Sequence, residues 1–234
     1  MIVRPRPHWL HLLFVRRGSM IRAIFSQQLF IFALPSRGTA ARPFVLGLIA
    51  FATTMRNQLR GLPREKDTAQ LLPPEIVITL RTARCAPVLV LQWLGEFLQN
   101  CRARRELDPQ LSRTIEESLN GLSAALGACE RIAGTPLPFT YSVILHRSAY
   151  LYCMLLPFGL VDSIGLMTPL VVTFVSYTFF ALEALSDEIE EPFGLMANDL
   201  ALDAMLAGID GSLRELLGET PPPAPLPDHN FQLS

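Results

Sequence analysis

The chain has few charged residues and few cysteines for its length. Of its 234 residues only 18% are charged, whereas 50% are hydrophobic, and the mean hydropathy is +0.32. A typical soluble domain is about 25% charged. The four cysteines, Cys85, Cys101, Cys129 and Cys153, are too few and too scattered for a disulfide framework or a zinc site, so we expect reduced, buried thiols. A membrane protein is therefore the first class to consider.

Constellations of reactive side chains are also lacking. The four histidines, His8, His11, His146 and His229, show no metal-ligand spacing with one another or with the cysteines. No nucleophile, metal or cofactor pattern is present, so we expect neither an enzyme nor a cofactor. We also expect no secretory signal peptide, because arginines interrupt the first apolar stretch and no small-residue cleavage site follows it.

The first 64 residues contain no acid but ten arginines, and the remaining residues contain 21 acidic against ten basic groups. The earliest arginines alternate with apolar residues, which favours an interfacial helix on anionic lipid over binding to nucleic acid. We expect no nucleic-acid partner. Because positive charge accumulates on the cytoplasmic side of a membrane, the N-terminus is predicted to be cytoplasmic.

Two long apolar runs follow in the second half of the chain. Residues 142–161 carry one formal charge, Arg147, and residues 169–185 carry Glu183 near their end. Each run is long enough for a membrane-spanning helix. The linker at 162–168 makes them a transmembrane hairpin, which returns the C-terminus to the cytoplasm. The alternative is a pair of buried core helices in a soluble protein.

The rest of the sequence is also helical in pattern. Residues 44–55 are apolar but too short to span a membrane, and we interpret them as a packed helix. Helical patterning resumes over 75–105, with an interruption at Pro87 and an apolar side that we list as Val88, Leu89, Leu91, Trp93, Leu94, Phe97 and Leu98.

Asp108 and Pro109 mark the start of the next helix, as its cap and first turn, and this helix continues to residue 132. Its predicted buried face consists of Ile115, Leu119, Leu122, Leu126 and Cys129. A last amphipathic helix is expected over 197–217. The predicted fold class is therefore an all-α membrane protein with a transmembrane helical hairpin and a cytoplasmic helical bundle.

These segments predict five regions. They are an N-terminal interfacial or truncated transmembrane segment (1–34), a cytoplasmic helical region (44–132), the transmembrane hairpin (142–185), an acidic cytoplasmic segment (186–220) and a Pro-rich, disordered tail (221–234).

A proline motif separates the long helix from the hairpin. Thr135, Pro136 and Pro138 cannot continue a helix, so the chain must break there and reach the membrane surface. Tyr141 then supplies an amphipathic ring at the interface, and His146 and Arg147 place polar groups against neighbouring helices. Plain membrane anchoring, without a role in transport, is an equally open interpretation of any one of these side chains.

Acidic residues recur without an intervening base after the second apolar run, from Glu183 to Asp210. Oxygen ligands at this density are compatible with calcium, but no EF-hand spacing is present. We favour a solvated acidic face.

The order of these motifs resembles the bestrophin family of pentameric membrane ion channels. The matching residues are Thr135, Pro136, Pro138, Tyr141, His146, Arg147, Pro192, Phe193 and Gly194. The resemblance implies a multi-pass subunit of the cell (inner) membrane that forms a homopentamer in the lipid bilayer and passes inorganic ions, either chloride or monovalent cations.

The resemblance also implies specific site residues. In calcium-gated members an Asp-rich run after Pro-Phe-Gly clasps calcium, and here only Asp199 remains as a weak calcium candidate. The family's narrow cytoplasmic aperture is lined by an aliphatic residue at the start of the helix before the proline motif, and Gln110 stands at that position as the pore candidate.

One expected segment is absent. Bestrophins carry a pore-lining helix with an apolar neck after the first span, whereas this sequence passes from Leu34 to Phe44 through only nine residues. An internal deletion of the pore and neck region is the interpretation that the resemblance suggests. The alternative function is therefore a non-conducting homologue that anchors in the membrane without a pore.

Overall fold

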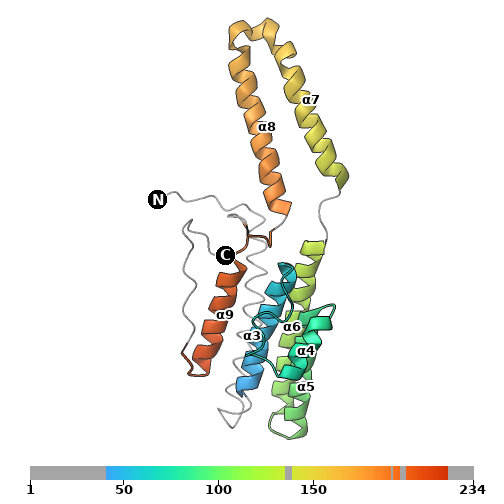
Figure 1. The fold of residues 1–234 in the computed structure, drawn as a ribbon, viewed down its shortest axis with the longest axis vertical. Helices are drawn as coiled ribbons and strands as arrows, with labels where there is room; N and C mark the ends of the chain where they lie inside the picture. Colours follow the sequence, from blue (N-terminus) through green and yellow to red (C-terminus); the bar gives the residue numbers. More distant parts are fainter. Residues whose placement is uncertain (1–40, 135–138, 191, 196–198, 221–234) are drawn as a thin grey trace. The chain divides into compact units, whose positions relative to one another are not determined.

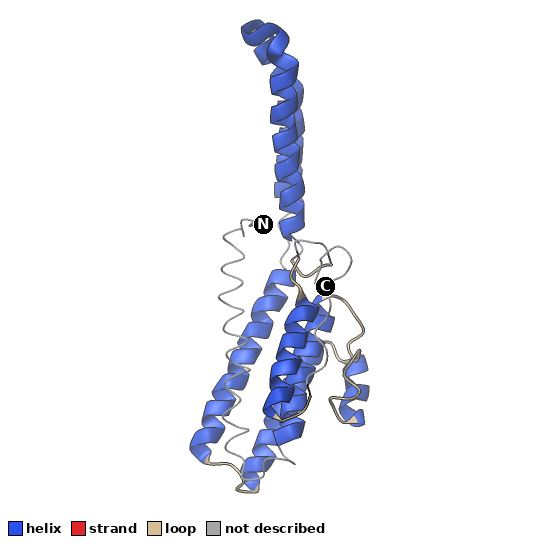
Figure 2. Ribbon diagram, turned by 90° about the vertical axis from the view of Figure 1, so that its left-hand side faces the viewer, coloured by secondary structure: helices blue, strands red, loops and turns tan. Residues whose placement is uncertain are grey.

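The structure is a computed structural model that describes residues 41–134, 139–190, 192–195 and 199–220, with residues 139–142 and 185–190 described by backbone alone. The described residues form helices and contain no strand (Figures 1 and 2). The elements are α3 (Ala41–Leu59), α4 (Pro74–Thr82), α5 (Ala86–Ala103), α6 (Pro109–Gly134), α7 (Phe139–Ile164), the short 3-10 helix η1 (Gly165–Met167), α8 (Thr168–Glu190) and α9 (Leu202–Leu216).

The described residues divide into two compact units. Residues 41–131 and 201–220 belong to unit 1, and the described residues between 132 and 200 belong to unit 2. Unit 1 therefore contains α9, which belongs to the predicted acidic segment (186–220), together with the helices α3 to α6.

Helix α3 is the centre of unit 1. It packs against α5 and α9 (Figure 1), and its residues from Phe44 to Asn57 are buried. A Cβ on Gly47 would lie 2.5 Å from Cζ3 of Trp93, so glycine allows the close approach of α3 and α5. The predicted packed helix over 44–55 is confirmed, and the structure extends it at both ends.

The interruption predicted at Pro87 lies slightly earlier, at residues 83–85 between α4 and α5. Pro87 sits in the first turn of α5, where no intrahelical donor is lost. The buried side of α5 consists of Val90, Leu94, Leu98 and Cys101. The placement of Val88 on the apolar side was wrong: Val88 is 48% exposed, because the buried positions recur every three or four residues from Val90.

Helix α6 begins where the sequence predicts. The Gln110 backbone N–H donates to Oδ2 of Asp108 over 3.1 Å, which is the expected cap. Ile115, Leu122 and Leu126 are buried, and Leu119 and Cys129 are partly buried against the core, so the predicted buried face is confirmed.

The last helix starts later than predicted. Helix α9 begins at Leu202 rather than at Ala197. The described residues 199–201 are not helical, and the Leu200 N–H donates to the Pro192 carbonyl over 2.9 Å instead of to a helical acceptor. The helix ends at Leu216, one residue from the prediction.

Unit 2 is built on the predicted hairpin. Helices α7 and α8 pack against each other and are joined by η1 (Figure 1). The turn is shorter than the predicted linker of 162–168, because Asp162 and Ser163 remain in α7. Gly165 has φ +50°, a left-handed conformation that favours glycine, and Thr168 Oγ1 donates to the Gly165 carbonyl over 2.6 Å.

Candidate functional site

The hairpin presents apolar side chains outward. The stretch Val143–Ala184 is long and apolar enough to cross a membrane, and only 6% of an 18-residue apolar window within it is buried. Among its large side chains, Met154, Phe158 and Phe174 are 73%, 74% and 69% exposed. Core helices of a soluble protein would instead bury this surface. The hairpin is therefore suited to a lipid surrounding, and the buried-core alternative does not fit it.

Aromatic rings line the contact between α7 and α8. The centroids of Tyr150 and Phe180 lie 5.2 Å apart, and those of Tyr152 and Phe179 lie 5.4 Å apart. Tilted aromatic pairs at these separations are favourable beyond the area that they bury. These contacts fix the register of the two helices in a region where burial itself contributes little.

One polar contact joins the same two helices. Nδ1 of His146 on α7 contacts Oε1 of Glu183 on α8. The Glu183 side chain is 18% exposed and the His146 side chain is 56% exposed. The sequence placed His146 against a neighbouring helix, and the structure identifies Glu183 as its partner there.

The other motif residues are distributed along the hairpin and after it. Arg147 is exposed on α7. After α8, Pro192 and Phe193 are buried and Gly194 is half-buried. Thr135, Pro136, Pro138 and the Tyr141 side chain lie outside the described residues.

The pore and calcium candidates lie in different parts of the chain. Gln110 is exposed in the first turn of α6, and its carbonyl accepts a hydrogen bond from Thr114 Oγ1 over 3.3 Å. Asp199 is half-buried in the turn before α9. Within the described residues, no three His, Cys, Asp or Glu side chains gather as a possible metal site.

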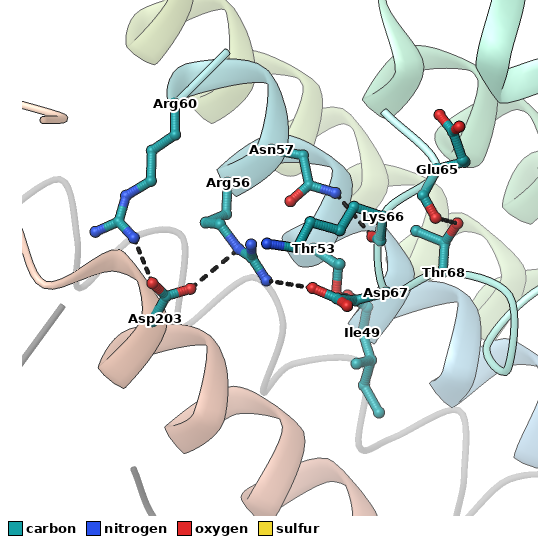
Figure 3. Close-up of polar contacts among 10 residues, drawn as sticks. All are labelled: Ile49, Thr53, Arg56, Asn57, Arg60, Glu65, Lys66, Asp67, Thr68 and Asp203. Carbon is teal, nitrogen blue, oxygen red and sulfur yellow. Dashed lines mark hydrogen bonds and ion pairs between the residues drawn. The ribbon is translucent and has the colours of Figure 1, made fainter. Parts of the chain in front are cut away.

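Unit 1 contains a buried ion-pair cluster that sequence reasoning missed. Arg56 of α3 and Arg60 in the turn directly after it, with side chains only 10% and 6% exposed, project toward Asp203 of α9 (Figure 3). Arg56 Nε lies 3.2 Å from Asp203 Oδ1, and Arg60 Nη1 contacts Asp203 Oδ2. We call Arg56, Arg60, Asp67 and Asp203 the arginine cluster.

The turn after α3 completes the arginine cluster. Arg56 Nη2 donates to Asp67 Oδ2 over 3.1 Å, and Asp67 has φ +62°, which aspartate tolerates better than most residues. The fully buried Asn57 donates from Nδ2 to the Lys66 carbonyl over 2.8 Å (Figure 3). These bonds hold the turn against the end of α3.

The acidic residues after the hairpin are therefore not all a solvated face. Asp203 pairs with two buried arginines, and Asp210 Oδ1 lies 2.6 Å from Arg214 Nε on the same helix. For these two residues, and for Glu183 with its 18% exposed side chain, the predicted solvated face was wrong. The available signal was the spacing of Arg56 and Arg60, one turn apart at the end of an apolar helix.

The thiols are less buried than expected. Cys101 is buried, but Cys85, Cys129 and Cys153 are half-buried, and all four are free. Burial raises the pKa of the Cys85 thiol, and its hydrogen bond to Glu130 Oε1, with Sγ to Oε1 at 3.2 Å, raises this pKa further. A raised pKa leaves less thiolate, so Cys85 is poorly suited to nucleophilic chemistry.

Comparison with known proteins assigns the family. The sequence model described as "Bacterial/Fungal Bestrophin protein" matches residues 35–215. The chain belongs to the bestrophin family. A crystal structure of a bacterial bestrophin homologue from Klebsiella pneumoniae is 34% identical and superimposes with a TM-score of 0.81, over 89% of this chain and 79% of that one. The predicted family and all-α fold are confirmed.

Relatives of this bestrophin carry names that describe channels and not enzymes. A "voltage-dependent anion channel-forming protein" of Ralstonia nicotianae is 42% identical over 80% of this chain and 62% of its own length. One of the same name from Mesorhizobium japonicum is 40% identical over 82% and 62%. The chain thus spans about three fifths of the length of these two relatives.

A third relative locates the length difference. The protein of the same name from Salmonella typhi is 32% identical over 304 aligned positions that cover the whole of both chains. Because this bestrophin has 234 residues, at least 70 of the 304 positions face no residue of it. These unmatched positions lie within the alignment, and the deletion of a single pore and neck segment stays a prediction.

Proposed function

We propose that this bestrophin is a subunit of an anion channel in a membrane. The observation that carries the proposal is the apolar and largely exposed hairpin of Val143–Ala184, in a chain whose relatives are named anion channel-forming proteins. A surface of this kind is stable only where lipid or other helices cover it. The likeness to the Klebsiella pneumoniae homologue supports the same assignment.

Several copies would have to surround one pathway. A hairpin of two spans cannot enclose a channel by itself, and closed rings are the usual solution for channels. We propose the homopentamer that the family resemblance implies, in the cell (inner) membrane with both termini in the cytoplasm. Its partners would be the lipid bilayer and inorganic anions such as chloride.

The proposed function is tested by chloride efflux from vesicles that contain the purified full-length protein. Vesicles are loaded with chloride, diluted into gluconate and made permeable to potassium with valinomycin. We expect efflux well above that of protein-free vesicles and of vesicles with an unrelated membrane protein. Efflux at the level of both controls would exclude conduction by this chain.

Gln110 is proposed to line the narrow cytoplasmic aperture. In conducting vesicles, Gln110→Ile should change the efflux rate, because an aliphatic ring is less hospitable to a hydrated ion than an amide ring. The matched control is Gln92→Ile, since Gln92 is an exposed glutamine on α5. Equal rates in the two variants would remove Gln110 from the pathway.

A second candidate function is a membrane-anchored homologue without a pore. The specific observation in its favour is that at least 70 of the 304 positions aligned with the Salmonella typhi protein face no residue of this chain. Light scattering of the protein in detergent, with the detergent mass subtracted, distinguishes the two. A protein mass near five subunits supports the channel, whereas a monomer without efflux supports the anchor.

A further inference from the structure

The turn that joins α7 to α8 is apolar and exposed (Figure 1). Leu166 and Met167 are 98% and 63% exposed, and Leu170 in the first turn of α8 is 69% exposed. Among residues 164–168 the one polar side chain is that of Thr168, which is buried. Large apolar side chains that gather at an exposed tip mark a contact surface. This turn therefore needs a partner of its own.

Charged side chains are nearly absent from the hairpin and from its turn. Between Arg147 and Glu183 the sequence contains one charged residue, Asp162, and residues 163–182 pass through the turn without any. Charge is what makes a segment costly to place among acyl chains. The apolar surface of the two helices thus continues without interruption through the turn.

The hairpin is also short for a bilayer. At about 1.5 Å a residue, α7 rises by about 26 Å from Arg147 to its end at Ile164, and α8 by about 23 Å from Thr168 to Glu183. The hydrocarbon core of a bilayer is about 30 Å thick. With Arg147 and Glu183 at one edge of this core, the turn lies a few ångströms inside the opposite edge.

The turn satisfies its polar groups internally, which is a requirement for structure in lipid. The Thr168 N–H and Oγ1 both donate to the Gly165 carbonyl, the hydroxyl over 2.6 Å. Gly165 has φ +50°, which allows the chain to reverse within the three residues of η1. A reversal this short leaves few backbone groups that need water.

We propose that the turn, residues 164–168, is seated among the lipids of the far leaflet, the one opposite Arg147 and Glu183, and does not project into water. The inference rests on the proposed function, because it requires α7 and α8 to lie in a membrane. Leu166 and Met167 contact acyl chains there, as the outward side chains of the two helices do.

Asp162 is compatible with this position. It is exposed near the end of α7, two residues before the turn. A bilayer thins around a hydrophobic segment that is shorter than its core, which brings the headgroups closer to such a side chain. The carboxylate then reaches the headgroups of the far leaflet while the apolar tip stays in contact with lipid.

Quenching of tryptophan fluorescence by brominated lipid tests the contact. Full-length Leu166→Trp is placed in phosphatidylcholine vesicles with or without bromine on the acyl chains, and the signal of the wild type, from Trp9 and Trp93, is subtracted. Because bromine quenches the rings that it touches, we expect the added fluorescence to fall in brominated vesicles. Ile78→Trp is the matched control, since Ile78 is an exposed apolar residue of unit 1, and its added fluorescence should stay unchanged.

A third variant separates the inference from the proposed function. Phe174→Trp, at a 69% exposed residue of α8, reports whether the hairpin itself lies in lipid. Quenching of Phe174→Trp without quenching of Leu166→Trp would overturn the inference alone. Emission at long wavelength would then place the turn in water, and emission at short wavelength would place it against protein, such as a second copy.

Two further outcomes concern the proposed function. If neither Phe174→Trp nor Leu166→Trp is quenched, the hairpin does not lie in lipid, and the inference and the proposed function fail together. If both variants are quenched but the vesicles release no chloride, conduction fails while the contact between the turn and lipid stands.

Discussion

The two units of this bestrophin use similar helices in opposite ways. In unit 1, α3 is buried along most of its length, and only Ile78 and Val88 are large exposed apolar residues among the described part of that unit. In unit 2, most large apolar residues of α7 and α8 point outward. Burial away from water stabilises unit 1, whereas lipid can satisfy the outward surface of unit 2.

In both units, however, the buried charged side chains contact a polar partner on another helix. Arg56 and Arg60 are nearly buried, and both meet Asp203 across a helix interface. Glu183 is also mostly buried and meets His146 across one. A buried charged group is tolerated where a polar partner is held in place beside it. The two units therefore differ in whether their apolar surfaces are buried, whereas both pair their buried charged side chains with a polar partner.

The largest expected difference between the two units is the loss of stability when a phenyl ring is removed from each. Phe51 of α3 is fully buried, whereas Phe158 of α7 is 74% exposed. Phe51→Ala should reduce the free energy of unfolding by about 3 to 5 kcal/mol, because it leaves a cavity. Phe158→Ala should cost less than about 1 kcal/mol. Melting temperatures in detergent measure both, and equal losses would contradict the assigned difference.

Introducing a charge at an exposed apolar residue should have the larger effect in unit 2, the opposite of the order expected for the phenyl rings. Met154 of α7 and Ile78 of α4 are 73% and 66% exposed. Met154→Arg places a charge in the apolar run and should cost about 3 kcal/mol of insertion free energy, whereas Ile78→Arg should change stability by less than about 0.5 kcal/mol. Extraction of membranes with alkaline carbonate measures insertion. If Met154→Arg stays in the membrane fraction as fully as Ile78→Arg, the hairpin is not surrounded by lipid there.

The arginine cluster should contribute more to stability than an ion pair within a single helix. Asp203→Asn leaves two nearly buried arginines without their shared partner and should cost about 2 kcal/mol, below the usual range for a buried pair because Asp203 is a third exposed. Asp210→Asn is the matched control, since its pair with Arg214 lies within one helix and contributes about 0.5 kcal/mol. The melting temperatures should fall in that order, and similar losses would show that the cluster contributes little.

Local signals in the sequence predicted the features that depend on near neighbours. The cap at Asp108, the apolar runs of the hairpin and the buried face of α6 all follow from residues within a few turns. The start of α9 was misplaced because Leu200 bonds to Pro192, eight residues earlier, and no spacing in the sequence indicates this contact. The division into five regions and the aperture role of Gln110 remain predictions.

Long-range partners could not be predicted in the same way. Nothing in the sequence indicated partners for Arg56 and Asn57, yet they lie at the buried end of α3, and Arg56 pairs with Asp203, which is far away in the chain. Likewise, the histidine of the hairpin was identified as a polar contact, but its partner depends on how α7 and α8 pack. Pairing of this kind follows from the tertiary fold and leaves no periodic pattern.

The smallest predicted effect concerns the partly exposed ion pair between Arg42 and Glu219 in unit 1, which acid should weaken. The hydrogen bond from Arg42 Nε to Glu219 Oε1, at 2.7 Å, holds the pKa of the Glu219 carboxyl below its usual range, and Arg214 lowers this pKa further. A lowered pKa in the folded state stabilises the protein above the pKa of the unfolded chain, and this contribution is lost as the pH falls through the folded value.

Arg42→Gln should therefore lower the melting temperature at neutral pH by roughly one or two degrees, because the pair is partly exposed, and the difference should vanish in acid below the folded pKa or in high salt. Arg81→Gln is the control, since Arg81 lies 3.6 Å from Glu65 and is 64% exposed, and it should have a smaller effect. A loss in Arg42→Gln that persists in acid would show that the Arg42 side chain stabilises unit 1 by packing rather than by its charge.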